Sequence, residues 1–495
     1  MRYSTFLFAT VITAGILFLQ GCEAPLQTPA ESAGFDDITH YDDVIVFCRE
    51  AAGRSDLIEM EVFGQSAEGR DLVVMKAGND HAGDPEEEKV RILMFAQQHG
   101  NEQSSKEGSL LLIRDIANGK YDHWFKDMEL WIIPQVNPDG GAENNRANAM
   151  GLDLNRDHVV QQAPETRALH ALFRQWMPHV TIDVHEYFPY RDAWAEFGGY
   201  KQFDVQVGVT TNINIDQQVQ QFSLTETLPW IEQQLEAGGF SFHNYLVGPP
   251  PSEGITRHST IDINDGRQSF GILNTMSFIF EGINGRDRYV DQLEHRSIGQ
   301  LTAMAAMMDF MQANREKVVS MVNESRKQLT QGKAGNTVAV QTDYVRSGEP
   351  LYMPLKSSAT GADTIVRVEN YHPLVEPVIV VERPLGYLIP ADDQQLLQWL
   401  SLHDIRTKEQ VPGEVKIYAY QLPETGPRKG EAPAKTRLDL EINNYVFVPS
   451  AQLHGNFLSL TLEPHSDIAL GRHQDFAYLL DGVGQYPVYR VESIQ

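Results

Sequence analysis

The stretch VRILMFAQQHGNEQSSKEGSLLLI, residues 90–113, gives the strongest indication of fold class, because it joins a strand pattern directly to a helix pattern. Residues 90–96 form a nearly continuous apolar run, which is typical of a strand buried on both faces of a sheet. Ser104 and Glu107 then have the spacing of a capping box, and leucines and isoleucines follow at helical intervals. A buried strand followed by a helix predicts an α/β fold.

The same alternation of short apolar runs and helical segments continues from about residue 40 to 325. It predicts a mixed, mostly parallel sheet with helices on both faces. We expect one helix from Pro164 to Trp176 and a long one from about Ser297 to Leu329. The candidate strands share their apolar character; they are Asp71–Met75, Val90–Ala96, Glu129–Val136, Val180–Val184 and Ser277–Phe280.

Chemically active side chains follow three of these strands. His99 and Glu102 lie three residues apart after the quoted strand, at the edge where open α/β sheets place their sites. An imidazole nitrogen and a carboxylate there can reach a single zinc ion. An HxxE pair alone is common by chance, so the prediction depends on two further strand ends. These deliver a second histidine, His185, and an acid, Glu281.

Two arginines lie in the sequence between these strand ends. Asn137-Pro138-Asp139-Gly140 is followed by Arg146, and Asp153-Leu154-Asn155-Arg156 comes shortly after. Taken in order, the strand-end residues and these two segments resemble the zinc metallocarboxypeptidases of the carboxypeptidase A and D type. The resemblance covers roughly residues 40 to 320.

The resemblance implies a role for each matched residue. It implies one Zn2+ ion per chain, held by His99, Glu102 and His185, and the carboxylate of Asp153 would orient a histidine ligand. Glu281 matches the family's general base.

The two arginines match residues that act on the substrate. Arg146 matches the arginine that polarises the scissile carbonyl, and Asn155 and Arg156 match the pair that binds the free C-terminal carboxylate of a peptide.

Elementary chemistry supports these roles. Two neutral imidazoles and one carboxylate leave zinc an open position for water, whose pKa falls towards neutrality. Glu281 at the neighbouring strand end can take that proton and deliver it to the leaving amine. Arg146 cannot lose its charge and suits a developing oxyanion. Arg156 can bind a carboxylate through two hydrogen bonds, so that only the last peptide bond reaches the metal.

One feature departs from the family pattern. Digestive members carry a tyrosine about twenty residues before the base, on a loop that closes over the substrate, and RHSTIDINDGRQSF, residues 257–270, has none. Tyr245 or His258 could replace it, and it is equally consistent with the sequence that neither does. Side-chain preference is therefore open.

The N-terminus has the pattern of a targeting signal. Residues 1–21 read as a signal peptide whose end, Leu19-Gln20-Gly21-Cys22, resembles a bacterial lipobox. We expect Cys22 to carry lipid and to anchor the protein in the cell envelope, at the outer membrane, with no other membrane contact. An ordinary secretory signal is the alternative. Residues 22–39 read as a polar tether, and Cys48 as a buried, inert thiol.

Near residue 331 the sequence pattern changes to an alternation of apolar and polar residues with period two, interrupted by turn residues. This pattern predicts a β-rich accessory domain over 331–495, beside a catalytic domain over 40–330. One helix is expected over about 392–402. The strand candidates are NTVAVQTDYV (336–345), DTIVRVENY (363–371), PVIVVE (377–382), GEVKIYAY (413–420), RLDLEINNYVFV (437–448) and LSLTLEP (458–464).

Composition excludes several classes of protein. The 495 residues carry a net charge of −27, which argues against a nucleic-acid partner because such a partner needs a basic face. Two cysteines exclude a disulfide scaffold and any multi-cysteine metal site. Oligomeric state cannot be read from the sequence.

Together these features predict a zinc hydrolase that releases C-terminal residues from peptides. A zinc amidohydrolase or deacylase, acting on N-acyl amino acids or murein-type peptides, is the first alternative. A non-catalytic envelope lipoprotein that uses the pocket as a receptor is the second. The presence of Arg146 together with Asn155 and Arg156 favours the peptidase.

Overall fold

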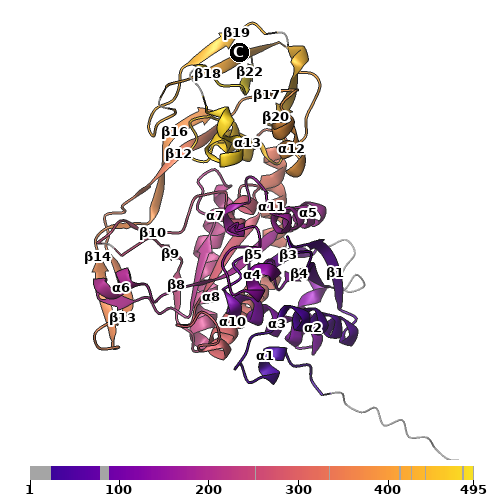
Figure 1. Ribbon diagram of the computed structural model, residues 1–495, viewed down its shortest axis with the longest axis vertical. Coiled ribbons are helices and arrows are strands. Elements are labelled where there is room, and N and C mark those ends of the chain that lie inside the picture. The colour runs from indigo at the N-terminus through magenta and orange to yellow at the C-terminus, as the bar shows by residue number, and fades with distance from the viewer. Residues whose placement is uncertain are drawn as a thin grey trace, which may run out of the picture.

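The computed structural model describes residues 24–78, 88–250, 252–333, 335–411, 414–424, 426–440, 442–481 and 484–493 (Figure 1). The signal peptide and the lipidation expected at Cys22 lie outside these residues. None of the helices in the described part has the length and apolar character needed to cross a membrane.

An eight-stranded mixed sheet forms the centre of the molecule, in the order β1-β2-β4-β3-β5-β11-β7-β8. The pairs from β4 through β3 and β5 to β11 are parallel, and β1, β2 and β7 join by antiparallel pairing. The predicted mixed α/β sheet is thus confirmed. The strands are β1 (Ile58–Gln65), β2 (Asp71–Ala77), β3 (Val90–Ala96), β4 (Met128–Ile133), β5 (Val180–Tyr187), β7 (Val205–Val209), β8 (Phe242–Asn244) and β11 (Met276–Ile283).

Helices cover both faces of this sheet, and the alternation of side chains along β3 shows why. Ile92 and Met94 belong to one buried cluster with α2, α3, α8 and α10, whereas Leu93 and Phe95 belong to a second with α5 and α9. Both faces of β3 are therefore buried against apolar side chains. The helices are α2 (Tyr41–Arg54), α3 (Gln103–Ala117), α4 (Pro138–Ala142), α5 (Pro164–Trp176), α7 (Gln217–Phe222), α8 (Leu228–Ala237), α9 (Gly266–Gly271), α10 (Leu293–Ala313) and α11 (Arg315–Thr330).

Two helix predictions need correction. The capping box expected at the start of α3 does not form: Ser104 donates its hydroxyl to Glu186, and Glu107 accepts bonds from Thr39. Tertiary partners have replaced the local cap. The single helix expected over 297–329 is two helices, α10 and α11, separated at Asn314, whose side chain donates to the carbonyl of Phe310.

The described residues of the expected tether, 24–39, pack against the body instead of extending from it. Leu26 is buried, and its backbone exchanges two hydrogen bonds with the side chain of Asn118. Thr28 and Glu31 form a capping box that starts the short helix α1 (Pro29–Ser32). Cys48, on α2, is a free and buried thiol as expected, and burial raises its pKa to about 12.

The chain after residue 335 adds a separate six-stranded sheet, at the top of the view in Figure 1, and a two-stranded sheet. LSLTLEP, expected as a strand, is helical over residues 458–462, which belong to α13 (Gly455–Leu462). All eight residues of α13 are buried, so the helix is enclosed on every side. The other elements are β12 (Thr337–Val345), β16 (Leu374–Glu382), β17 (Gly386–Pro390), α12 (Gln394–Leu402), β18 (Val415–Leu422), β19 (Lys435–Leu438), β20 (Tyr445–Pro449), β21 (Gly484–Gln485) and β22 (Tyr489–Ser493).

Part of this C-terminal region returns to the first sheet's loops. The hairpin of β13 (Leu351–Ser357) and β14 (Asp363–Val368) pairs with β6 (Gly199–Tyr200), and β15 (Tyr371–His372) pairs with β10 (Thr256–His258), which in turn pairs with β9 (Leu246–Val247). A separate buried cluster forms here from Trp194, Phe203, Leu246, Met353, Leu355 and Val368. The expected boundary near residue 331 is therefore crossed by strand pairing.

Candidate active site

The loop between β3 and α3 is held in place by a close backbone approach. A Cβ on Gly100 would lie only 2.1 Å from the carbonyl carbon of Gly140, so the HGNE loop and the NPDG turn require glycine where they meet. Asn137 caps the turn by accepting from the amide of Gly140, and donates to the carbonyl of Gln98. This contact fixes the position of the neighbouring His99.

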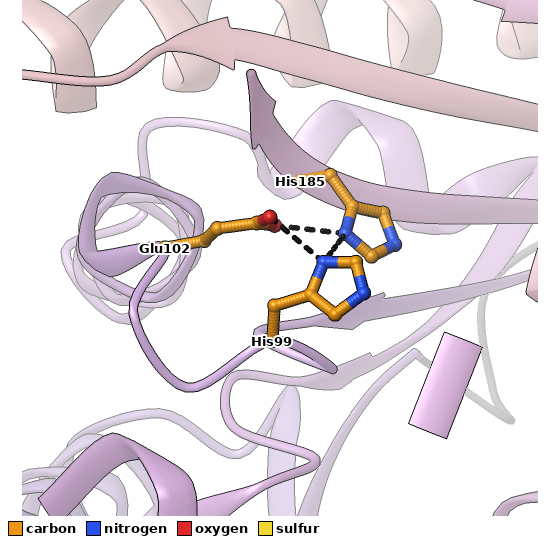
Figure 2. Close-up of side chains that lie close together, drawn as sticks. All are labelled: His99, Glu102 and His185. Atoms are coloured by element: carbon orange, nitrogen blue, oxygen red, sulfur yellow. Dashed lines mark hydrogen bonds and ion pairs between the residues drawn. The ribbon is translucent and has the colours of Figure 1, made fainter. Parts of the chain in front are cut away.

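Three predicted ligands converge at the carboxyl ends of β3 and β5 (Figure 2). One carboxylate oxygen of Glu102 lies 2.7 Å from Nδ1 of His99, and the other lies 2.8 Å from Nδ1 of His185. The two Nδ1 atoms are 3.1 Å apart. Their ligand atoms all fall within 4.8 Å of one another, so the three residues could hold one metal ion. Two imidazoles and a carboxylate suit zinc with a further position open.

A carboxylate supports the far nitrogen of each histidine. Asp153 Oδ1 lies 3.1 Å from Nε2 of His99, and Asp183 Oδ1 lies 2.7 Å from Nε2 of His185. Such contacts fix the tautomer and ring orientation of a metal ligand. The sequence had singled out only Asp153. Asp183 was missed, although it lies two residues before His185 and so on the same side of β5.

Mutual electrostatics shift the pKa values of this buried group. Burial opposes the charged form of Glu102, but the nearby His99 and His185 outweigh it and lower the pKa of the carboxyl. Burial likewise opposes the charged form of His185, and Asp183 and Glu102 raise its pKa well above the usual value. The cluster therefore has the negative ligand field that a divalent cation requires.

The structure places Arg146 beside this cluster. Its Nε donates to Asp153 at 2.9 Å, and one terminal nitrogen lies 3.3 Å from Nδ1 of His99. Its side chain is 46% exposed, so the guanidinium reaches the cavity from the solvent side.

Asn155 and Arg156 also line the cavity, but they are held differently. Asn155 is buried; its amide oxygen accepts from the backbone N–H of Gly266 at 2.7 Å, and its nitrogen lies 3.2 Å from Nε2 of His185. Arg156 is exposed and donates to the carbonyl of Asn155, with no carboxylate at ion-pair distance among the described residues. Of these two residues, only Arg156 therefore has a side chain that is exposed and open to a ligand.

Glu281 lies on β11, directly beside His185 in the parallel register of β11 and β5. Only 7% of its surface is exposed, and this burial raises its pKa to about 7. The hydroxyl of Tyr245 forms a hydrogen bond to its carboxylate.

One cavity of about 390 Å³ is lined by most of these residues: His99, Glu102, Arg146, Asn155, Arg156 and Glu281. His185, Asp153 and Asp183 are not among its lining residues. Tyr245 is part of its wall, whereas His258 is not among the lining residues. Of the two candidates for the missing tyrosine, the structure therefore brings only Tyr245 to the site.

Sequence reasoning missed further residues of the wall. Three cations, Arg191, Lys201 and Arg288, line the cavity together with aromatic rings from the segment after β5. A net charge of −27 gave no indication of these cations. Glu186, which also reaches the wall, is paired with the buried Arg296 at 2.7 Å.

Comparison with known proteins adds independent evidence. Residues 44–191 match the family model described as zinc carboxypeptidase. Carboxypeptidase 2 of Trichophyton rubrum is 26% identical over 355 residues, which cover 69% of this chain and 64% of that protein. A zinc carboxypeptidase of Saccharothrix mutabilis subsp. capreolus is 32% identical over 124 residues, covering 21% of this chain and 28% of that protein. The chain thus spans less than two thirds of the length of Carboxypeptidase 2.

Among solved structures, the chain is similar to carboxypeptidase A from Helicoverpa armigera. It is 14% identical, with a TM-score of 0.44, over 57% of this chain and 75% of that chain.

Proposed function

Because residues 44–191 match the family model described as zinc carboxypeptidase, we propose that the protein is a zinc-dependent hydrolase that releases C-terminal residues from peptides. The observation that supports this most directly is the shared cavity. The candidate metal ligands His99 and Glu102, the buried acid Glu281 and the exposed guanidinium of Arg156 all line the same space of about 390 Å³.

His99, Glu102 and His185 would hold the zinc ion, one per chain, and Asp153 and Asp183 would keep the two imidazoles oriented. When bound, zinc supplies Lewis-acid chemistry, polarising the scissile carbonyl and lowering the pKa of water.

Glu281 acts as the general base in this proposal. It takes a proton from the attacking water and passes it to the leaving amine nitrogen. A carboxyl whose pKa is raised by burial to about 7 can exchange that proton near neutral pH. The hydroxyl of Tyr245 donates to the ionised carboxylate and keeps it aimed into the cavity.

Arg146 and Arg156 act on two different groups of the substrate in this proposal. Arg146 stabilises charge that develops on the scissile carbonyl oxygen, since its guanidinium lies beside His99. Arg156 binds the terminal carboxylate of the peptide and sets the register. Asn155 contributes by positioning, because its amide oxygen already accepts from the backbone N–H of Gly266.

Digestion of a mixed peptide library, read by mass spectrometry, tests this function. We expect peptides shortened by one residue at the C-terminus, and free amino acid in equal amount. Glu281→Gln keeps the size of the side chain but cannot accept the proton, and should reduce release by at least about a hundredfold. Zinc content, measured by atomic absorption, should stay near one equivalent in the variant.

Other outcomes of these experiments would favour a different function. Turnover of N-acyl amino acids without release from peptides would make the protein a deacylase. Peptide binding without turnover, at full zinc occupancy, would make it a receptor. A purified protein that cannot take up zinc would refute the hydrolase proposals altogether.

A further inference from the structure

One part of the cavity wall is basic beyond what the proposed reaction uses. It comes from two segments that continue past the ends of β5 and β11, and it carries Arg191, Lys201 and Arg288. Among the described residues, none of the three has a carboxylate partner at ion-pair distance. We refer to these three residues as the cationic wall.

Lys201 is the most constrained of the three. It is 9% exposed, its Nζ donates to the carbonyl of Leu246 at 3.2 Å, and the ammonium lies over the rings of Tyr187 and Trp194 at 5.6 Å and 5.3 Å. Burial, and secondarily Arg191, lower its pKa to about 8, so it remains charged at neutral pH. Glu281 opposes this shift through its charge, but among the described residues no carboxylate lies at ion-pair distance from Lys201. A buried cation without such a direct partner is costly, and an anionic ligand would relieve that cost.

Arg288 and Arg191 extend the same wall towards solvent. The guanidinium of Arg288 lies 3.9 Å from the ring centre of Phe188, an arrangement that holds the charged plane in place while leaving its edge open. Arg191 is exposed at the start of the helix α6 (Asp192–Phe197), which carries Trp194. The three cations thus offer donors from the floor of the cavity to its rim.

The cationic wall is distinct from the group that binds the terminal carboxylate. Arg156 belongs to the turn at 153–156, which is fixed by Asn264 and Gly266. No contact of Lys201, Arg191 or Arg288 in the described part of the chain involves residues 153–156 or 260–266. A substrate whose end is held by Arg156 therefore meets the cationic wall with another of its groups.

We infer that the cationic wall is a subsite for a second carboxylate of the substrate, on a residue upstream of the scissile bond, so that acidic peptides are the preferred substrate class. This inference rests on the proposed function, because it places the peptide by its C-terminus. Lys201 binds the carboxylate at depth, and Arg191 and Arg288 guide it from the rim.

Blocked tripeptides that differ at one position test the inference with the full-length, zinc-loaded protein. One peptide has Glu immediately before the scissile bond, a second has Gln there, and a third has Gln there and Glu as the C-terminal residue. The wild type should hydrolyse the first about tenfold faster than the second, measured as kcat/KM. Binding of each peptide to Glu281→Gln is measured in parallel by calorimetry.

Three variants identify the residues responsible. Lys201→Met keeps an unbranched side chain that is one atom shorter and removes its charge, and should lower the Glu-to-Gln ratio to about two or less. Arg288→Gln should lower the ratio less, because its charge is exposed. Lys327→Met, on the exposed face of α11 and paired with Glu324, is the matched control and should keep the ratio of the wild type.

The outcomes separate this inference from the proposed function. Release from all peptides at equal rates, or a preference only for a C-terminal Glu, would overturn the subsite and leave the peptidase intact. Absence of release from every peptide would overturn the peptidase. In that case tighter binding of the first peptide, lost in a Lys201→Met variant, would still support the subsite, and equal binding would refute it.

Discussion

Asp183 is the residue whose role is most sharply defined by its contacts. It accepts from the Nε2 of His185 at 2.7 Å and from the side-chain amide of Gln98 at 2.9 Å, in a position with 1% exposure. Asp183→Asn keeps the shape of the side chain but weakens the charge-assisted bond to the imidazole. We expect zinc affinity, measured by competition with a chelator, to fall by about 10–100-fold.

Asp157→Asn supplies the matched comparison for this change. Asp157 is also buried, but its carboxylate accepts from the backbone amides of Gln162 and Ala163 and forms no hydrogen bond or ion pair with a histidine of the described residues. Its substitution should alter stability and leave zinc affinity unchanged. Equal losses of zinc affinity in the two variants would show that Asp183 acts only through folding.

At the scale of residues, the sequence located groups whose chemistry is concentrated at strand ends, such as His99, Glu102 and Glu281. It could not locate Lys201, because a single lysine in a loop is normally solvated. What makes Lys201 unusual is the pair of rings and the carbonyl that enclose it, and Leu246, which supplies the carbonyl, lies far along the chain. Contacts of that kind are not encoded in local spacing.

At the scale of elements, the hairpin β13–β14 supports the cavity wall from behind. Met353, on β13, is fully buried in the cluster that contains Trp194 and Phe203. Met353→Ala should remove about 2–5 kcal/mol of packing from this cluster. We expect faster proteolysis within residues 192–203 and a several-fold lower kcat/KM, with zinc content unchanged.

Ile365→Ala, on the neighbouring strand β14, is the control for this change. Its side chain is 69% exposed, so the substitution removes a similar volume without opening a cavity in the cluster. If both variants behave like the wild type, the hairpin does not support the wall.

Local patterns predicted the central strands well, because strands buried on both faces have a distinctive apolar composition. They failed where tertiary partners override local preference. LSLTLEP alternates like a strand, yet the shared core around it buries every side, and a helix satisfies its backbone internally. The capping-box pattern at Ser104 failed for a related reason, since Glu186 competes for the same hydroxyl.

At the scale of the whole molecule, four buried histidines join the central fold to the C-terminal region. His158 and His170 are 2.9 Å apart, the ring of His403 lies 6.0 Å from that of His170, and the ring of His454 lies 6.4 Å from that of His403. Burial lowers the pKa of His158 to about 4 and the pKa values of His403 and His454 to about 3. The pKa of His170 is also lowered well below its usual value by burial.

These shifts predict loss of stability in acid. Below the unfolded pKa of about 6.5 the unfolded chain binds protons that the folded chain excludes, so unfolding becomes easier as pH falls towards the folded values. Each of these histidines then lowers the free energy of unfolding by up to about 1.4 kcal/mol for each pH unit. We expect the urea midpoint to be constant above about pH 7 and to fall steeply between about pH 6.5 and 4.5.

His454→Phe removes one of these protonation sites and should make the pH dependence shallower. His123→Asn, at an exposed position, should leave it as in the wild type. Saturating zinc in all samples removes the contribution of metal loss from the difference between variants. An identical slope in His454→Phe and wild type would contradict the assignment.

The pairing of β13 with β6 has a consequence for biosynthesis. Tyr200 pairs with Lys356 in the antiparallel register of β6 and β13. The strand β6 is synthesised early, and its partner β13 is synthesised more than 150 residues later. During vectorial synthesis the metal-ligand loops can fold while the wall that carries Lys201 still lacks its support, because non-local pairing cannot form until both strands exist. The nascent chain would therefore hold the proposed metal-ligand group without a finished substrate cavity, which would delay the proposed peptidase activity until synthesis is nearly complete.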